Sequence, residues 1–247
     1  MKNSGNLILA GSLLLSANVL AAEKDEAVEK SPWKSSVELG FVRTTGNTET
    51  QTTSLKANVV YEVDKWRHKG HAEAYGTETE NDAGENEVSA ERYVLSGKSD
   101  YKFSELDYMF ALVKLQKDRF SGFEYEHIIS LGYGRKVIKQ DNMELDLEIG
   151  PGVRLFKVED GESDSEALLR LAADYWWQIS DNSKFTQELS TDIGEDITSS
   201  QSITGIQANI NSALALKATY TVRHKSEVPE GTEKTDTEVG ITLVYNF

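Results

Sequence analysis

Apolar and polar residues alternate along most of the chain, and the alternation is clearest in the last eleven residues. From Val239 onwards every odd position is apolar, the polar residues fall on even positions, and the last residue is Phe247. Successive side chains of a β-strand point to opposite faces, so this segment has one apolar and one polar face. A terminal strand of this kind that ends in aromatic residues is typical of the strand that closes a membrane β-barrel.

The same period of two predicts further strands upstream. Together with the closing strand they number about twelve, within a range of roughly ten to fourteen, because strand boundaries are the hardest feature to place. The predicted strands are Trp33–Thr44, Gln51–Asp64, Trp66–Gly76, Ser89–Phe103, Leu106–Lys117, Glu126–Lys139, Met143–Lys157, Ala167–Ile179, Lys184–Gly194, Ile203–Asn211, Leu214–Lys225 and Thr237–Phe247. We therefore expect an all-β fold, an antiparallel up-and-down transmembrane β-barrel over residues 33–247.

The connections between these strands are predicted to alternate strictly between long and short. The long ones are Arg43–Thr50, Thr77–Val88, Asp118–Tyr125, Val158–Glu166, Glu195–Ser202 and Ser226–Thr235, and the short ones are Asp64–Lys65, Ser104–Glu105, Gln140–Asn142, Ser180–Ser183 and Asn211–Ala213. Short periplasmic turns and longer outside loops are typical of outer-membrane barrels. An even number of strands places both ends of the barrel on the periplasmic side.

Aromatic residues gather near the ends of the strands that carry the short turns. They are Trp33, Tyr61, Trp66, Tyr101, Phe103, Tyr108, Trp176, Trp177, Phe185, Tyr245 and Phe247. This placement predicts an aromatic girdle at the periplasmic membrane interface. The alternative is the core of a soluble β-protein, but core aromatics need not gather at one end.

The N-terminal segment has the features of a secretory signal peptide. A short polar region with Lys2 precedes the apolar run Leu7–Leu20 and then Ala21–Ala22, which is too short for a spanning helix. We expect cleavage after residues 1–22, a short charged periplasmic segment over 23–32, and export out of the cytoplasm. No later apolar stretch approaches eighteen residues, which excludes helical spanning, and the absence of Cys excludes disulfides and lipidation of a cysteine.

The formal net charge is −15, and Lys2 is the only charged residue of the signal segment. Nucleic acid is excluded as a partner because phosphate binding needs a basic surface. Acidic residues crowd three predicted outer loops: Glu78, Glu80, Asp82, Glu85 and Glu87; Glu159, Asp160, Glu162, Asp164 and Glu166; and Glu227, Glu230, Glu233 and Asp236. These loops are either simply solvated or contact neighbouring lipopolysaccharide through divalent cations.

Charged residues of both signs recur on the polar face of the predicted strands. The candidate lumen-lining residues are Lys56, Arg67, Lys69, His71, Glu73, Arg92, Lys98, Glu148, Arg154, Arg170, Asp174, Glu188, Lys217 and Arg223, together with Asp100, Glu144, Asp146 and Asp192. Charges at membrane depth must face protein or water, so this face lines the lumen. The lumen is then either a water-filled selective pore or a space closed by salt bridges. A narrow or blocked lumen is the favoured interpretation, because twelve strands enclose a modest bore.

Glycines and one proline interrupt two adjacent predicted strands. Pro151 lies in the strand Met143–Lys157, where a closed barrel has no edge to accommodate it, so we expect a bulge or kink at Gly150–Gly152. Gly132 and Gly134 on the preceding strand leave little bulk on the inner wall. We expect a large inward ring from elsewhere to fill this space.

No catalytic motif was found. The four histidines, His68, His71, His127 and His224, form no His-Glu-x-x-His pattern, and no Gly-x-Ser-x-Gly or Walker sequence occurs. We expect no enzyme activity, cofactor or metal. The enzyme alternative is a phospholipase-type barrel with a Ser–His pair on its outer wall, but the outward His68 lies at the periplasmic rim, away from the outer leaflet.

Four segments together resemble a known family. They are Gly46–Thr48, Leu131–Gly134, Gly150–Arg154 and Leu243–Phe247, and their order and spacing are similar to the salt-induced outer-membrane protein family, long classed as a domain of unknown function. The resemblance implies a Gram-negative outer-membrane β-barrel with no established substrate. It also implies that the assembly machinery reads the terminal residues Leu243, Tyr245 and Phe247.

The expected function is therefore non-enzymatic. The protein is expected to be a narrow small-solute or ion channel or an envelope structural component in the outer membrane, in contact with lipid and lipopolysaccharide; an osmotic or salt response is a further expectation. A ligand-binding role of the acidic outer loops is the alternative.

Overall fold

The computed structural model describes residues 31–44, 50–80, 86–119, 121–158 and 161–247. The chain divides into two units, Met1–Ser31 and Pro32–Phe247, and the fold described below is that of the second. The predicted signal peptide lies outside the described residues. Within the described ranges, no helix is long and apolar enough to cross a membrane.

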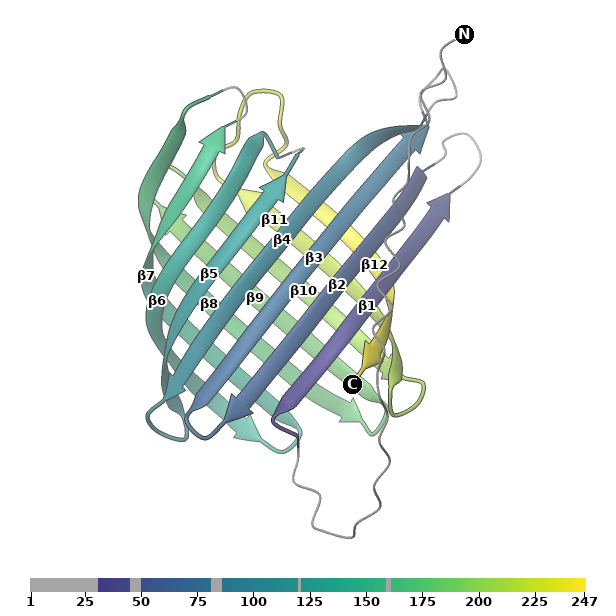
Figure 1. Cartoon of the computed structure of the whole chain (residues 1–247), viewed down its shortest axis with the longest axis vertical. Helices are drawn as coiled ribbons and strands as arrows, with labels where there is room; N and C mark the ends of the chain where they lie inside the picture. Colours follow the sequence, from purple (N-terminus) through teal and green to yellow (C-terminus); the bar gives the residue numbers. More distant parts are fainter. Residues whose placement is uncertain (1–30, 45–49, 81–85, 120, 159–160) are drawn as a thin grey trace. The chain divides into compact units, whose positions relative to one another are not determined.

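Twelve strands form one closed antiparallel barrel in which each strand pairs with its neighbours in the chain and β1 pairs with β12 (Figure 1). The strands are β1 Trp33–Thr44, β2 Thr50–Val63, β3 Trp66–Glu80, β4 Asn86–Lys102, β5 Asp107–Asp118, β6 Phe123–Gln140, β7 Met143–Val158, β8 Ser163–Ser180, β9 Ser183–Gly194, β10 Thr198–Asn209, β11 Leu214–Lys225 and β12 Thr235–Asn246. Closure gives every strand two neighbours, so most backbone groups of the strands are hydrogen-bonded where lipid offers no partners. The predicted up-and-down barrel is confirmed.

The connections depart from strict alternation of long and short. At one end of the barrel, the turn end, they are 64–65, 103–106, 141–142, 181–182 and 210–213; at the other, the loop end, they are 45–49, 81–85, 119–122, 159–162, 195–197 and 226–234. The predicted loop Glu195–Ser202 shrinks to 195–197, because Thr198–Ser202 continues β10 and pairs with β9. Threonine favours strands, but a polar run without apolar alternation resembles a loop.

The outer face of the barrel is apolar and the inner face is polar. In β12, Leu243 and Tyr245 are 45% and 51% exposed, whereas Thr242 and Val244 are 4% and 2% exposed. Leu131, Ile149 and Leu171 on other strands are likewise exposed, while charged residues such as Asp100 and Arg154 are fully buried. This inversion of a soluble core is typical of a transmembrane barrel.

The two faces of β12 predict opposite responses to a lysine. Leu243→Lys places a charge on the lipid face and is expected to cost about 2 kcal/mol, following the depth dependence measured for barrel exteriors. Thr242→Lys places the charge beside Glu38, whose Oε2 lies 3.4 Å from Thr242 Oγ1, and is expected to cost less. The folded fraction on a heat-modifiable gel measures both. A larger loss for Thr242→Lys would contradict the assigned faces.

Two aromatic rings fill the glycine-lined part of the inner wall. Phe110 and Tyr108 on β5 are 3% and 2% exposed. A Cβ added at Gly132 would lie 2.7 Å from Phe110 Cε1, and one added at Gly134 would overlap the Tyr108 ring. The expected inward rings are thus supplied by β5, and the glycines make room for them.

Of the bulge or kink predicted at Gly150–Gly152, the bulge is wrong. On the β6 side, pairing omits Leu131 and Gly132 between Ser130↔Gly152 and Tyr133↔Ile149 but keeps the same register, and on the β8 side Pro151 pairs with Leu169. Ser130 Oγ donates a hydrogen bond of 2.9 Å to the Pro151 carbonyl. The side-chain-free glycines let the two strands approach closely, so the proline is accommodated without an inserted residue.

Only some of the residues predicted to form the aromatic girdle at the turn end lie on the outer face. Trp33, Trp66, Phe103 and Tyr245 are exposed on the outer face; Trp33 and Tyr61 have ring centroids 4.4 Å apart. Two predicted members face the lumen instead. Tyr108 is buried. Trp176 lies on the same face of β8 as Arg170 and Asp174, and its ring lies under the Lys184 ammonium. Around Tyr108 on β5 and Trp176 on β8, apolar residues occur on both faces of the strand, so the alternation of residue types does not show which face is the outer one.

Candidate functional site

Charged side chains from strands far apart in the barrel meet inside the lumen near the turn end. Arg67 on β3 donates from Nε to Asp100 Oδ2 at 2.7 Å and from Nη2 to Asp146 Oδ2 at 3.1 Å. Asp146 lies on β7, and three strands separate β3 from β7 in the sheet. The Arg67–Asp146 pair therefore crosses the lumen.

Tyr108 lies at the centre of this cluster. Its hydroxyl donates to Glu148 Oε1 at 2.7 Å, and Lys98 pairs with the same carboxylate and, at 3.3 Å, with Asp100. The Arg67 guanidinium and the Lys98 ammonium lie 5.0 and 5.4 Å from the centre of the Tyr108 ring, within the range of cation–π attraction. We call the set Arg67, Lys98, Asp100, Tyr108, Asp146 and Glu148 the turn-end plug.

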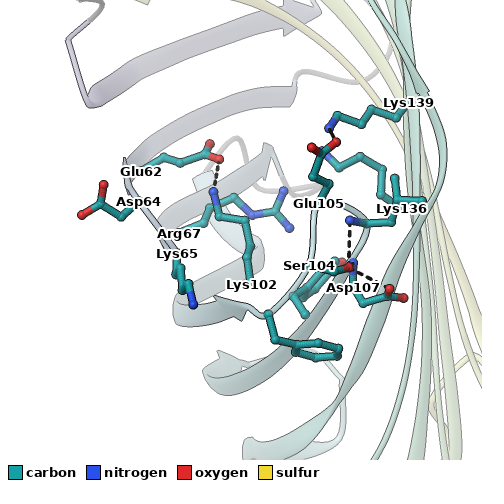
Figure 2. A pocket seen from close by; sticks show the side chains of 13 residues that line it. Glu62, Asp64, Lys65, Arg67, Lys102, Ser104, Glu105, Asp107, Lys136 and Lys139 are labelled. Carbon is teal, nitrogen blue, oxygen red and sulfur yellow. Dashed lines mark hydrogen bonds and ion pairs between the residues drawn. The ribbon is translucent and has the colours of Figure 1, made fainter.

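A pocket of about 390 Å³ opens at the turn end, next to the plug (Figure 2). Arg67 and Tyr108 belong to its lining, so the plug forms part of its wall. Two ion pairs lie in its lining: Lys102 with Glu62 at 2.7 Å and Lys139 with Glu105 at 3.0 Å. The pocket is therefore a charged mouth of nearly balanced sign, without the excess of one charge that would select strongly for an anion or a cation.

A second cluster of charged side chains lies inside the barrel near the loop end. Arg154 is fully buried; it pairs with Glu166, lies 3.8 Å from Glu126, and donates to the backbone carbonyls of Ile197 and Asp192 at 2.7 and 3.2 Å. Lys225 on β11 pairs with Glu126 on β6 across the barrel. We call Glu126, Arg154, Glu166 and Lys225 the loop-end network.

Further ion pairs line the wall between the two clusters. Arg92 bridges Glu73 and Glu238 at 2.7 and 2.8 Å, and Glu238 also receives Arg223 at 3.1 Å. The remaining pairs are Lys56–Glu73 at 3.6 Å, Lys217–Glu38 at 3.0 Å, Arg170–Asp192 at 2.8 Å and Lys69–Asp174 at 3.7 Å. His71 Nδ1 lies 2.7 Å from Asn58 Oδ1.

The structure thus brings together most residues that alternation placed on the inner face. Glu188 differs, because it lies opposite Asp174 in the β8–β9 register and forms no ion pair with another described residue. Residues that the sequence did not single out as lumenal are Glu38, Tyr108, Glu126, Glu166, Lys225 and Glu238. Strand parity could have identified Glu38 and Glu238. Glu166 was assigned to a loop, and β8 starts before it.

The four histidines lie on three strands, His68 and His71 on β3, His127 on β6 and His224 on β11. Among the described residues, no group of three or more His, Asp or Glu side chains is arranged to hold a metal ion. His68 Nδ1 does lie 2.8 Å from Ser99 Oγ on the outer face. Its ring stacks on Trp66 at 5.6 Å, which makes it part of the aromatic girdle, and no carboxylate among the described side chains orients it as a general base would require.

Two solved structures share this fold. The NanC porin superimposes with a TM-score of 0.54 at 9% identity over 85% of this chain and 98% of that chain. The COG4313 outer membrane channel from Pseudomonas putida F1 has a TM-score of 0.52 at 12% identity over 93% of this chain and all of that one, 100%. At such identities the likeness concerns the fold alone.

A relative in sequence is found in Escherichia coli (strain K12). The uncharacterized protein YdiY is 29% identical over 250 residues, which cover 98% of this chain and 96% of YdiY. The profile of the family described as "Protein of unknown function, DUF481" matches residues 37–247. The chain belongs to this DUF481 family.

Proposed function

We propose that this protein is a non-enzymatic outer-membrane barrel that serves as a narrow channel for small solutes or ions. The turn end faces the periplasm, and the turn-end plug limits the passage. The single observation that carries this proposal is the set of ion pairs that cross the lumen, above all Arg67–Asp146 and Lys98–Glu148. In this proposal they keep the lumen polar and narrow the passage at the turn end.

A purely structural barrel would not need such an interior. Buried ion pairs give little or no stability over well-packed apolar residues of the same volume. A polar path lined by paired charges of both signs instead provides sites for water and ions once a pair separates. The exterior supports a location in the outer membrane, because its apolar band and aromatic girdle match a bilayer.

A salt response would act through the pairs that water reaches. Lys69 and Asp174 pair at 3.7 Å with side chains 33% and 43% exposed, whereas Asp100 in the plug is fully buried. At physiological ionic strength the screening length is about 8 Å, so added salt weakens the exposed pair first. In this proposal, the salt concentration regulates the channel through such exposed ion pairs.

Conductance in planar lipid bilayers tests the channel. Wild-type protein is expected to give small discrete steps, and Arg67→Ala/Asp146→Ala, which removes both partners of the crossing pair, should give steps several-fold larger. The matched control Lys139→Ala/Glu105→Ala removes one pair of opposite charges at the exposed mouth and should leave the steps unchanged. Silence of all three proteins over a wide voltage range would contradict the channel and favour an envelope structural component.

The partners in this proposal follow from the exterior. Lipid and lipopolysaccharide contact the apolar face. The assembly machinery reads the terminal strand: the Phe247 backbone pairs with Ser35 at 3.0 and 3.1 Å, while its side chain is 68% exposed next to Tyr245. This leaves the terminal ring accessible for recognition.

A further inference from the structure

The seam between the first and last strands is zipped over only part of its length. Register pairing between β1 and β12 runs from Ser36↔Asn246 to Gly40↔Thr242 and stops there. Both strands continue beyond this point on their other sides: β1 pairs with β2 up to Thr44, and β12 pairs with β11 from Thr235 onwards. In the described part of the seam, Phe41–Thr44 and Thr235–Ile241 have no register partners in each other.

The seam therefore consists of a zipped half near the C-terminus, where β1 and β12 lie side by side (Figure 1), and an unzipped half towards the loop end. Apolar side chains on both borders of the unzipped half are exposed. Phe41 is 63% and Val239 is 74% exposed on the outer face. Val42 shares the inward parity of Glu38 and is nevertheless 46% exposed, so an apolar group borders the opening on the lumen side too.

Charged groups inside the barrel join β12 to β3, β4 and β11 beside the unzipped half. Glu238 on β12 receives Arg92 from β4 at 2.8 Å and Arg223 from β11 at 3.1 Å. Arg92 in turn holds Glu73 on β3 at 2.7 Å. The lumen face of the opening thus carries these charged groups together with Val42, and its membrane face is apolar.

The unpaired strand edges and the apolar membrane face together limit which kind of molecule can occupy the opening. Bare strand edges are costly in lipid because their backbone groups lack hydrogen-bond partners, so a group that hydrogen-bonds must cover them. A further β-strand that pairs with both edges fits poorly, because the unpaired stretch of β1 is only Phe41–Thr44 and strands typically span about five to six residues. A polar head beside the edges and an acyl chain beside Phe41 and Val239 satisfy both demands.

We propose that the unzipped half of the β1–β12 seam is a lateral portal through which a membrane amphiphile, with a polar head and an acyl chain, passes between the lumen and the loop-end leaflet of the bilayer. This goes beyond the proposed channel, because the route bypasses the turn-end plug. The portal therefore stands whether or not the barrel conducts ions across the membrane.

Single cysteines test the portal, because the chain contains no native Cys. Val42→Cys is the probe and Thr52→Cys is its matched control: the two residues are register partners with the same inward parity, but Thr52 lies in closed wall between β1 and β3. Each variant carries a photoactivatable diazirine in phosphatidylcholine vesicles, and only protein with heat-modifiable mobility is scored. We expect several-fold more phosphatidylcholine adduct at position 42. Equal adduct at both positions, or a cross-linked dimer in place of a lipid adduct, would overturn the proposal.

A second measurement examines the seam without lipid. Val42 and Gly240 would be register partners if pairing continued past Gly40↔Thr242, whereas Leu39 and Leu243 are partners in the zipped half. Mild oxidation should form a disulfide readily in Leu39→Cys/Leu243→Cys and several-fold more slowly in Val42→Cys/Gly240→Cys. Equally rapid disulfide formation in both would show a closed seam and refute the portal.

Discussion

Arg154→Ala is expected to lower the free energy of unfolding by about 3 to 5 kcal/mol, the usual consequence of removing one partner of a buried ion pair. Arg154 is fully buried, and without it Glu166 and Glu126, 7% and 8% exposed, keep charges that water barely reaches. The measurement is urea-induced unfolding in detergent micelles, followed by tryptophan fluorescence and by heat-modifiable mobility.

Arg119→Ala is the matched control for this prediction. Arg119 lies 3.3 Å from Glu91, but its side chain is 62% exposed, and exposed pairs contribute about 0 to 1 kcal/mol. A similar loss in both variants would mean that the loop-end network holds the barrel no more strongly than a surface pair does.

Gly134→Ala is the second substitution with a large expected effect. The new methyl group would overlap the Tyr108 ring, and forcing extra volume into a packed interior costs about 1 to 3 kcal/mol. The ring must move, which weakens its hydrogen bond to Glu148 and disturbs the turn-end plug. We expect a lower urea midpoint and, in bilayers, altered conductance steps.

Two variants separate overlap from a general glycine effect. Gly97→Ala should be close to neutral, because a Cβ there meets no atom within 4 Å. Tyr108→Ala combined with Gly134→Ala should lose less stability than the sum of the two single variants, since neighbours that share one space are not additive. Full additivity would exclude contact between residues 108 and 134 as the cause.

The alternation of residue types determined a large part of this fold. A period of two identified all twelve strands, and the observed bounds of β1 and β11 equal the predicted ones. The same parity placed Arg67, Arg92 and Arg154 on the inner face, because a strand must turn its charged side away from lipid. Such information is local, so a single sequence contains it.

Alternation failed where a strand is apolar on both faces or polar on both. Residues 108–113 of β5 are all apolar, so Tyr108 could be assigned to the girdle although its ring lies in the lumen. Thr198–Ser202 is almost entirely hydroxylic, so the start of β10 was taken for a loop. In both stretches, pairing with the neighbouring strands, rather than the residues of the segment itself, determines the secondary structure and which face is the inner one.

The sequence by itself therefore determined the strands, their order and which face of most strands is polar. Only the tertiary structure decided which inner charges meet, because Arg67 and Asp146, 79 residues apart in the chain, become neighbours through the curvature of the closed wall. It also decided where the zipper between β1 and β12 stops, since closure depends on the tilt and stagger of all twelve strands together. These are properties of the whole barrel, and no segment carries them alone.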